Sequence, residues 1–326
     1  MSANKPIAIS CGEPAGIGPE IAYAAWTQTR DEGAVVWIGD PRHLPDGAIF
    51  QTIDNAQDAA AISHFALPVL ARDFGTKAIH GHPQIDHAPQ VVAAISESVQ
   101  LAKLGQIAGI CTAPIHKSAL IEGANFAYPG HTEFIAALLD APHPVMMLAS
   151  DQLRVVPATI HIPISEVPDA LTPELIRSCL RTTHAALQSD FGIENPTIAV
   201  AGLNPHAGES GKMGREELDM MIPTLNSLRA EGINIIGPLS ADTMFHPAAR
   251  ATYDAAVCAY HDQALIPIKT IDFSGGVNVT LGLPIVRTSP DHGTAFDIAG
   301  KGIADATSMV AALRMARQMA DKRGLS

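Results

Sequence analysis

Three of the fourteen histidines follow apolar stretches in the same way, and together they could bind a metal ion. His161 follows RVVPATI, His206 follows TIAVAGLNP and His261 follows AAVCAY. If these stretches are parallel β-strands, their carboxyl ends lie at one edge of a sheet, where ligands bind. Neutral imidazole is a common ligand of divalent transition metals, and three protein ligands leave one position open for a substrate. Each histidine alone is better explained as a loop or core residue, so the prediction depends on the trio.

A second group of residues has the composition of a binding site for an anion. In YPGHTEFIAALL, Thr132 could cap a helix whose free backbone N–H groups favour negative charge. Lys269, Asn278 and Arg287 occur in IKTIDFSGGVNVTLGLPIVRT, which carries little other charge. Cations among apolar residues need partners if they are buried, and a phosphate is one such partner. The alternative is that Lys269 and Arg287 are exposed surface charges.

The elements that must position these residues alternate between strands and helices. Strands are expected within residues 5–10, 34–39, 106–114, 155–162, 197–204 and 255–262. Helices are expected from Pro19 onward and within residues 89–105, 172–192, 215–232 and 305–324. This alternation predicts an α/β fold with largely parallel strands. The chain shows no internal repeat and no evident linker, so any two domains must be closely joined.

The glycine-rich segment CGEPAGIGPE after the first expected strand is not a Rossmann fingerprint. Its glycines, Gly12, Gly16 and Gly18, do not have the G-x-G-x-x-G spacing of a dinucleotide-binding loop. The segment is instead typical of a tight loop that leads into a helix with proline in its first turn. A dinucleotide bound here would therefore not be held in the Rossmann way.

Composition restricts the class of protein. The net charge is −12 and no basic stripe is present, which argues against a nucleic-acid surface, although a small anionic substrate needs only a few local cations. The four cysteines form no C-x-x-C pair and are expected to be reduced. MSANKPIAIS lacks the apolar run of a signal peptide, and no stretch is long enough for a membrane helix. We therefore expect a soluble, cytoplasmic protein of one large or two ordinary domains.

The chain resembles the 4-hydroxythreonine-4-phosphate dehydrogenase family. The motifs that carry the resemblance are, in order, GEPAGIGPE, TAPIHK, PGHTE, AGLNPHAGESGKMGREE, GPLSADTMF, YHDQALIPIK and GGVNVTLGLPIVRTSPDHGTAFDIAGKG. They cover most of the chain, and residues 31–85 are the least distinctive part. The resemblance implies two α/β/α domains with a cleft between them, like those of isocitrate and isopropylmalate dehydrogenases. The expected domains are residues 1–130 with about 275–326, and about 131–274.

The resemblance also assigns residues and partners. It implies that His161, His206 and His261 are metal ligands, the same three that the strand-end argument selects. It implies substrate contacts at His131, Thr132, Lys269, Asn278 and Arg287. It further implies NAD or NADP as coenzyme, a Zn²⁺, Mg²⁺ or Co²⁺ ion, and a homodimer with the active site at the subunit interface. Strand-end geometry by itself would allow all three histidines to converge within one subunit.

The implied reaction belongs to the synthesis of pyridoxal 5'-phosphate. NAD oxidises the secondary alcohol of 4-phosphohydroxy-L-threonine, and the resulting β-keto acid loses CO2 to give 3-amino-1-hydroxyacetone 1-phosphate. A bound metal ion would act as a Lewis acid. His131 and Asp242 are candidate acids or bases, and Lys269 is counted with them as a catalytic residue. Asp242 is explained equally well as a helix N-cap or turn residue.

Three other functions are compatible with parts of this pattern. The nearest is a dehydrogenase for a related phosphorylated hydroxy acid, such as 4-phospho-threonate or 4-phospho-erythronate. The other two are an acyl–phosphate transferase of related fold, which the three histidines disfavour, and a three-histidine metal hydrolase. Neither of these last two would reduce NAD, so an NAD-reduction assay separates them from a dehydrogenase.

Overall fold

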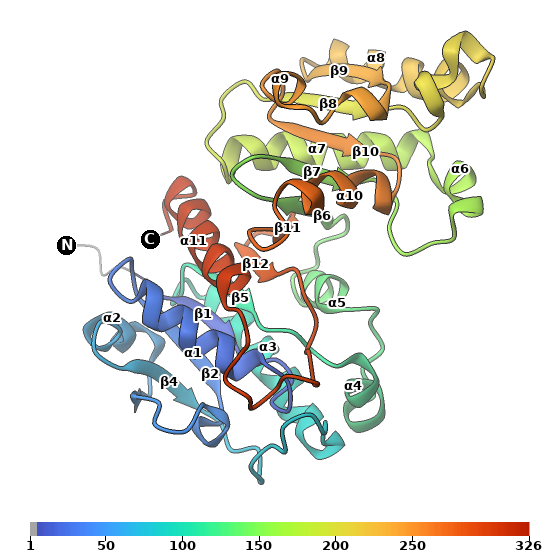
Figure 1. Cartoon of the computed structure of the whole chain (residues 1–326). Coiled ribbons are helices and arrows are strands. Elements are labelled where there is room, and N and C mark those ends of the chain that lie inside the picture. Colours follow the sequence, from blue (N-terminus) through green and yellow to red (C-terminus); the bar gives the residue numbers. More distant parts are fainter. Residues whose placement is uncertain (1–4, 326) are drawn as a thin grey trace. The chain divides into compact units, whose positions relative to one another are not determined.

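The computed structural model describes residues 5–325 (Figure 1). The segment considered above for a signal peptide therefore lies partly outside the described residues. The chain divides into two compact units: the first extends to Pro142 and resumes at Leu283, and the second is His143–Gly282. The chain thus leaves the first unit once and returns to it.

The first unit contains a parallel sheet with the strand order β3-β4-β2-β1-β5-β12. Its strands are β1 (Ile7–Ser10), β2 (Val35–Gly39), β3 (Phe50–Thr52), β4 (Leu67–Ala71), β5 (Gly109–Thr112) and β12 (Arg287–Pro290). Strands β1, β2, β5 and β12 are buried at every position. Helices cover both faces of a parallel sheet, so its central strands are almost continuously apolar, as the short apolar runs of the sequence indicate.

Helices lie on both faces of this sheet. They are α1 (Gly18–Thr29), α2 (Ala59–Ile62), α3 (Ala88–Lys103), α4 (Lys117–Ala124), α5 (His131–Leu138) and α11 (Thr307–Lys322), with short turns η1 (Pro41–His43), η2 (Ala56–Asp58) and η3 (Ile85–His87). Helices α1 and α11 pack side by side on one face, and α3 packs on the other (Figure 1). Helix α3 in turn supports α4 and α5, whose first residues are Lys117 and His131.

The second unit contains a mixed sheet with the strand order β11-β6-β7-β10-β8-β9. Its strands are β6 (Val145–Ala149), β7 (Arg154–Pro157), β8 (Thr197–Ala201), β9 (Asn234–Leu239), β10 (Ala255–Cys258) and β11 (Val277–Leu281). Strands β7, β10, β8 and β9 are parallel to one another, and β6 is antiparallel to both β7 and β11. The three strands that precede the candidate histidines, β7, β10 and β8, are therefore adjacent and parallel.

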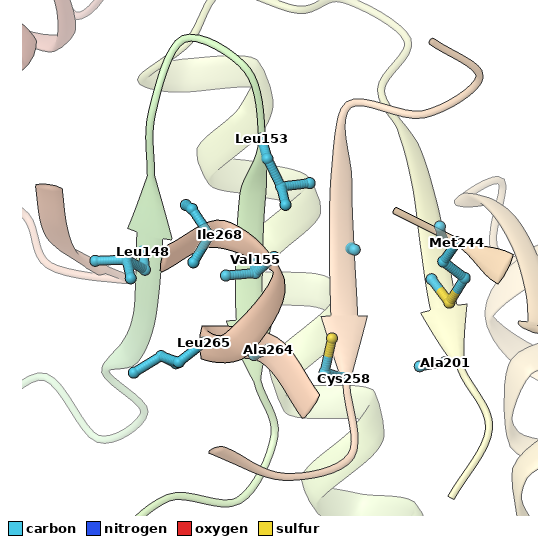
Figure 2. Close-up of a cluster of buried hydrophobic side chains, with 11 residues drawn as sticks. Leu148, Leu153, Val155, Ala201, Met244, Cys258, Ala264, Leu265 and Ile268 are labelled. Atoms are coloured by element: carbon cyan, nitrogen blue, oxygen red, sulfur yellow. The ribbon is translucent and has the colours of Figure 1, made fainter. Parts of the chain in front are cut away.

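The helices of the second unit pack against this sheet. They are α6 (Val167–Ala170), α7 (Pro173–Ser189), α8 (Ile222–Ala230), α9 (Pro247–Arg250) and α10 (His261–Ile271), with a π-helical turn η6 (Glu217–Met221) and short turns η4 (Ile164–Glu166), η5 (Pro205–Gly211) and η7 (Ala241–Thr243). Figure 2 shows α10 lying across the sheet, with Ala264, Leu265 and Ile268 against Leu148 and Val155. Burial of a large apolar side chain contributes about 1.5–3 kcal/mol, so this contact holds the helix that begins at His261.

Most of the elements expected from the sequence are present, and the predicted α/β class is confirmed. The four cysteines are free and buried, as expected for reduced residues. Burial raises the pKa of the Cys111 and Cys179 thiols to about 12, so these thiols are poor nucleophiles at neutral pH. Among residues 5–325, no helix is both long and apolar enough to span a membrane.

Two buried histidines lie next to each other in the first unit. The rings of His43 and His87 are 5.2 Å apart, and both contact the edge or face of Phe74. His43 Nε2 lies 3.1 Å from the carbonyl oxygen of Thr76, and His87 Nε2 lies 3.0 Å from its hydroxyl. Burial lowers the pKa of both imidazoles, against the opposing effect of Asp40 and the bonds to Thr76. Both rings are therefore neutral in the folded protein at neutral pH.

This pair predicts a loss of stability in mild acid. Below pH 6.5 the unfolded chain protonates both histidines while the folded protein does not, so stability falls as the pH drops from about 6.5 towards the lowered folded pKa values. Each histidine contributes at most about 1.4 kcal/mol per pH unit to this fall. Denaturant unfolding at pH 8, 6.5 and 5 should show a shallower pH dependence in His43→Gln/His87→Gln than in the parent. Replacing the exposed His64 with Gln should leave the slope unchanged, and equal slopes in all three proteins would contradict the assignment.

Candidate active site

The carboxyl ends of β7 and β10 bring two of the three candidate metal ligands together. The ladder between these strands extends past both strand ends, because the N–H groups of Ala158 and Thr159 donate to the carbonyl oxygens of Cys258 and Ala259. The side chain of Thr159 also donates to Ala259 O at 2.8 Å. His161 and His261 each follow this last pair by two residues, and their ring centroids are 5.6 Å apart.

These two histidines line one cavity of about 250 Å³ in the second unit. His261 Nδ1 lies 2.7 Å from Oδ1 of Asp262. A carboxylate can only accept a hydrogen bond, so in the neutral ring the proton is on Nδ1 and the lone pair is on Nε2. This is the tautomer in which metal-binding histidines are usually held by a neighbouring carboxylate. Two neighbouring imidazoles, one of them with its Nε2 lone pair free, are chemically able to bind a metal ion.

His206 lies beyond the end of β8, in a loop with an uncommon backbone. Residues 206–210 all have positive φ angles, and that of His206 is 52°. The buried carboxylate of Glu217 holds this loop by accepting from the backbone N–H and the side-chain amide of Asn204. His161 also has a φ of 52°. Such conformations cost about 1–3 kcal/mol in residues other than glycine and gather at functional sites, so they support a role for both histidines.

Residues 5–325 do not assemble a three-residue metal site. In the described part of the chain, no group of three or more His, Cys, Asp or Glu side chains is arranged to hold one ion. The structure thus brings His161 and His261 together and leaves His206 outside that pair. It ties the loop after β8 to β10 through Gln263, which accepts from Ala259 N and donates to Gly202 O at 2.9 Å. Neither Asp262 nor Gln263 was selected from the sequence, although both stand in the YHDQ motif.

Helix α10 also carries Lys269, the first of the predicted substrate contacts in this unit. Residues four apart lie on the same helical face, so His261, Leu265 and Lys269 form one row. They line a second cavity, of about 340 Å³. The Lys269 ammonium lies 5.8 Å from the ring centre of Phe273.

The other two predicted residues of the second unit lie on β11 and in turn η7. The Asn278 side chain is half-buried on β11, and its Oδ1 has no hydrogen-bond partner within residues 5–325. Asp242 is exposed, and its Oδ1 accepts from the hydroxyl of Ser240 at 2.6 Å. A buried acceptor without a partner costs free energy, so the position of Asn278 favours binding of a polar ligand. The contacts of Asp242, in contrast, are those of a turn residue.

The remaining predicted substrate residues belong to the first unit. Arg287 begins β12 and is only 3% exposed, and its Nη2 donates to Thr112 Oγ1 on β5 at 2.8 Å. Burial lowers the pKa of Arg287 to about 10, although Cys111 and the carboxylate of Glu133 act in the opposite direction. The alternative of an exposed surface charge is therefore wrong for Arg287. A buried guanidinium is suited to bind an anion.

His131 and Thr132 open helix α5. The helix begins at His131 and its N-cap is Gly130, which makes no side-chain cap hydrogen bond, so the prediction that Thr132 caps the helix is wrong by two positions. Glycine is a permitted N-cap residue, and its extended backbone moves the helix start before Thr132. His131 Nε2 is buried and has no hydrogen-bond partner in the described part of the chain. Burial, followed by the charges of Arg287 and Lys117, holds the pKa of His131 well below its usual range.

The glycine-rich loop after β1 is explained by packing within its own unit. A side chain at Gly12 would place Cβ 2.4 Å from Pro114 O, and one at Gly16 would place it 2.7 Å from Thr294 O. The loop is held there by hydrogen bonds from Glu13 N to Pro114 O and from Ile17 N to Thr294 O. Three sequence motifs thus meet at the carboxyl ends of β1, β5 and β12. This is the edge where ligands of α/β sheets bind, although no Rossmann loop is present.

Comparison with known proteins places the chain among close relatives. Residues 31–316 match the family described as "Pyridoxal phosphate biosynthetic protein PdxA". A protein of Ruegeria sp. (strain TM1040) named 4-hydroxythreonine-4-phosphate dehydrogenase is 57% identical, over 98% of each chain. One of the same name from Roseobacter denitrificans is also 57% identical, over 98% of each chain. The crystal structure of the enzyme of that name from Klebsiella pneumoniae matches with a TM-score of 0.86 and 36% identity, covering 97% of this chain and 99% of that one. The chain therefore belongs to the family of pyridoxal phosphate biosynthetic protein PdxA.

Proposed function

We propose that the chain oxidises 4-phosphohydroxy-L-threonine with NAD and releases CO2, giving 3-amino-1-hydroxyacetone 1-phosphate for the synthesis of pyridoxal 5'-phosphate. The full-length relatives carry the name of this dehydrogenase, and a dehydrogenase of this family uses a nicotinamide coenzyme. The single structural observation that carries the proposal is the pairing of His161 with His261 beside a cavity, with Asp262 holding the His261 tautomer.

His161, His261 and His206 would hold a divalent metal ion. The first two fit this role because their rings are neighbours and because Nε2 of His261 is left with its lone pair. The ion would supply Lewis acidity at the substrate oxygen. Imidazole ligands suit Zn²⁺, and Co²⁺ or Mg²⁺ are the alternatives.

The chain's own residues bind the substrate and move its proton. In the proposed reaction the hydroxyl proton leaves to a base and the hydride passes from the hydroxyl-bearing carbon to NAD. Loss of CO2 then leaves an electron pair that is taken up on the new carbonyl as an enolate, and a proton returns to the carbon that carried the carboxyl group. His131 is the best candidate for the base, because its lowered pKa keeps the imidazole neutral and its Nε2 is open. Arg287 and Thr132, and in the second unit Lys269 and Asn278, would hold the anionic and polar groups of the substrate. Asp242 remains a weaker candidate for proton transfer.

We propose that a homodimer completes the metal site. Since His161 and His261 are neighbours in one chain, the ligand that a second subunit would supply is His206. Subunit mixing tests this division. His161→Ala and His206→Ala are each expected to be inactive, but after subunit exchange about half of the dimers are mixed and one of their two sites is intact. About a quarter of the parent activity should therefore return.

The matched control mixes His161→Ala with His261→Ala. In the proposed site His161 and His261 come from the same chain, so every site of every mixed dimer lacks one ligand. This mixture should therefore remain inactive although exchange has occurred. Exchange itself is followed by mass spectrometry of differently tagged subunits. Recovery in the control mixture but not in the first mixture would reverse the proposed division. Inactivity of both mixtures, with exchange complete, would place all three ligands on one chain.

An assay of NAD reduction against several phosphorylated hydroxy acids tests the proposed function. We expect the highest kcat/KM with 4-phosphohydroxy-L-threonine, and lower values with 4-phospho-threonate and 4-phospho-erythronate. A clear preference for either of the latter two would assign the chain to the related substrate. Turnover of a phosphorylated substrate without NAD reduction would reject the dehydrogenase.

A further inference from the structure

Lys117, which the sequence reasoning did not select, lies beside the predicted substrate residues of the first unit. It is exposed and is the first residue of helix α4. A side chain built on Gly130 would place its Cβ 3.9 Å from Lys117 Nζ and 3.7 Å from Lys117 Cε. Gly130 is the N-cap of helix α5, so the Lys117 ammonium stands over the start of the helix that carries His131 and Thr132.

The charges around this point are mostly positive. Arg287 and Lys117 both act on the imidazole of His131, and each lowers its pKa. The nearest opposing charge is the carboxylate of Glu133, whose Oε2 would lie 3.4 Å from the same added Cβ. Within residues 5–325, no ion pair joins Lys117 to a carboxylate at 4.0 Å or less. Two full cations and one carboxylate leave a net positive charge, which favours an anion.

The backbone adds to the same preference. Helix α5 begins at His131 and its first N–H groups receive no side-chain cap, so they too favour negative charge. Gly130 has no side chain that would cover them. Lys117 and Arg287 both act on His131, the first residue of this uncapped helix, and the buried Nε2 of His131 has no hydrogen-bond partner within residues 5–325.

We propose that Lys117 is a further substrate-binding residue, whose ammonium and the Arg287 guanidinium together hold one anionic group of the substrate beside His131. The inference rests on the proposed substrate site. The chemistry required is an oxyanion, which the substrate offers twice, as phosphate and as carboxylate. A phosphate dianion matches two cations best.

Binding of simple anions to the full-length protein tests the proposal without requiring turnover. Isothermal titration of inorganic phosphate, with L-threonine as the carboxylate probe, compares the parent with Lys117→Ala, Lys117→Arg and Lys103→Ala. Lys103 is an exposed lysine of α3 in the same unit and serves as the matched control. Loss of a charge-assisted hydrogen bond should weaken phosphate binding by about tenfold or more in Lys117→Ala, with partial rescue by Arg and no change in the control.

The outcomes separate the sources of the anion and the two proposals. A change confined to L-threonine would assign the carboxylate to Lys117, and unchanged binding of both probes would overturn the inference. Since these titrations need neither NAD nor metal, failure of the parent to reduce NAD would count against the proposed function alone. As a second readout, histidine-selective NMR should show the pKa of His131 rising in Lys117→Ala, because a neighbouring positive charge is lost. An unchanged pKa would show that the Lys117 ammonium does not act on His131, and would contradict the shared position of the two side chains.

Discussion

Removal of divalent metal is expected to abolish NAD reduction, and addition of Zn²⁺, Co²⁺ or Mg²⁺ is expected to restore at least part of it. The expectation follows from His161 and His261, which lie side by side at the ends of adjacent parallel strands and line one cavity. A Lewis acid supplies several kcal/mol of stabilisation to developing negative charge, so no residual route through the side chains should approach the parent rate. The measurement is NAD reduction after chelation and dialysis, with the metal content determined by elemental analysis.

Two substitutions refine this expectation. His261→Ala should lose both bound metal and activity. Asp262→Asn keeps the shape of the side chain but removes the charge that holds the His261 tautomer, and loss of such a contact typically costs 10–100-fold in metal affinity or activity. The exposed His64→Ala should behave as the parent. Full activity in a sample shown to be free of metal would contradict the assignment of the three histidines.

Replacing Arg287 with Ala is expected to produce the second-largest effect. The guanidinium is buried and donates to Thr112, and burial lowers its pKa, so it is a desolvated cation at the start of β12. Removal of one partner from a buried charge pair costs about 2–5 kcal/mol. We expect kcat/KM for the phosphorylated substrate to fall accordingly. Arg287→Lys should not restore it fully, because the planar fork is lost.

The controls for Arg287 separate binding from folding. Arg72 is exposed and pairs with Glu97 on the surface of the same unit, so Arg72→Ala should leave the kinetics unchanged. Thermal unfolding of each variant shows whether the buried substitution has also destabilised the unit. If Arg287→Ala folds and turns over the phosphorylated substrate like the parent, Arg287 does not bind the substrate.

The strand ends could be predicted because burial leaves a clear pattern in the sequence. The runs before His161, His206 and His261 are mostly apolar, which is typical of strands covered on both faces. Their adjacency could not be predicted, because the order β7-β10-β8 depends on the crossover from β7 to β8 through α7 and on the return from β9 to β10 through α9, which local sequence does not specify. The sequence also did not indicate β6 and β11, which extend the sheet beyond β7 by antiparallel pairing.

The finer features of the site depend on contacts between distant residues. The loop that contains the left-handed His206 is held by Glu217, eleven positions away, through hydrogen bonds from Asn204. The positive environment of His131 arises from Lys117 and Arg287, which different motifs supply. Helix α5 starts at His131 rather than after Thr132. This difference arises locally, because the extended Gly130 takes the N-cap position. Residue type alone does not distinguish that choice from a threonine cap.

The most direct test of the proposed reaction is its stoichiometry with 4-phosphohydroxy-L-threonine labelled with ¹³C in the carboxyl group. The purified, metal-loaded protein is incubated with NAD, and NADH, labelled CO2 and the phosphorylated product are each quantified. We predict one NADH and one labelled CO2 for each substrate consumed, with 3-amino-1-hydroxyacetone 1-phosphate as the product. Consumption of substrate without NADH, or NADH formed with the label still in the organic product, would contradict the proposed oxidative decarboxylation.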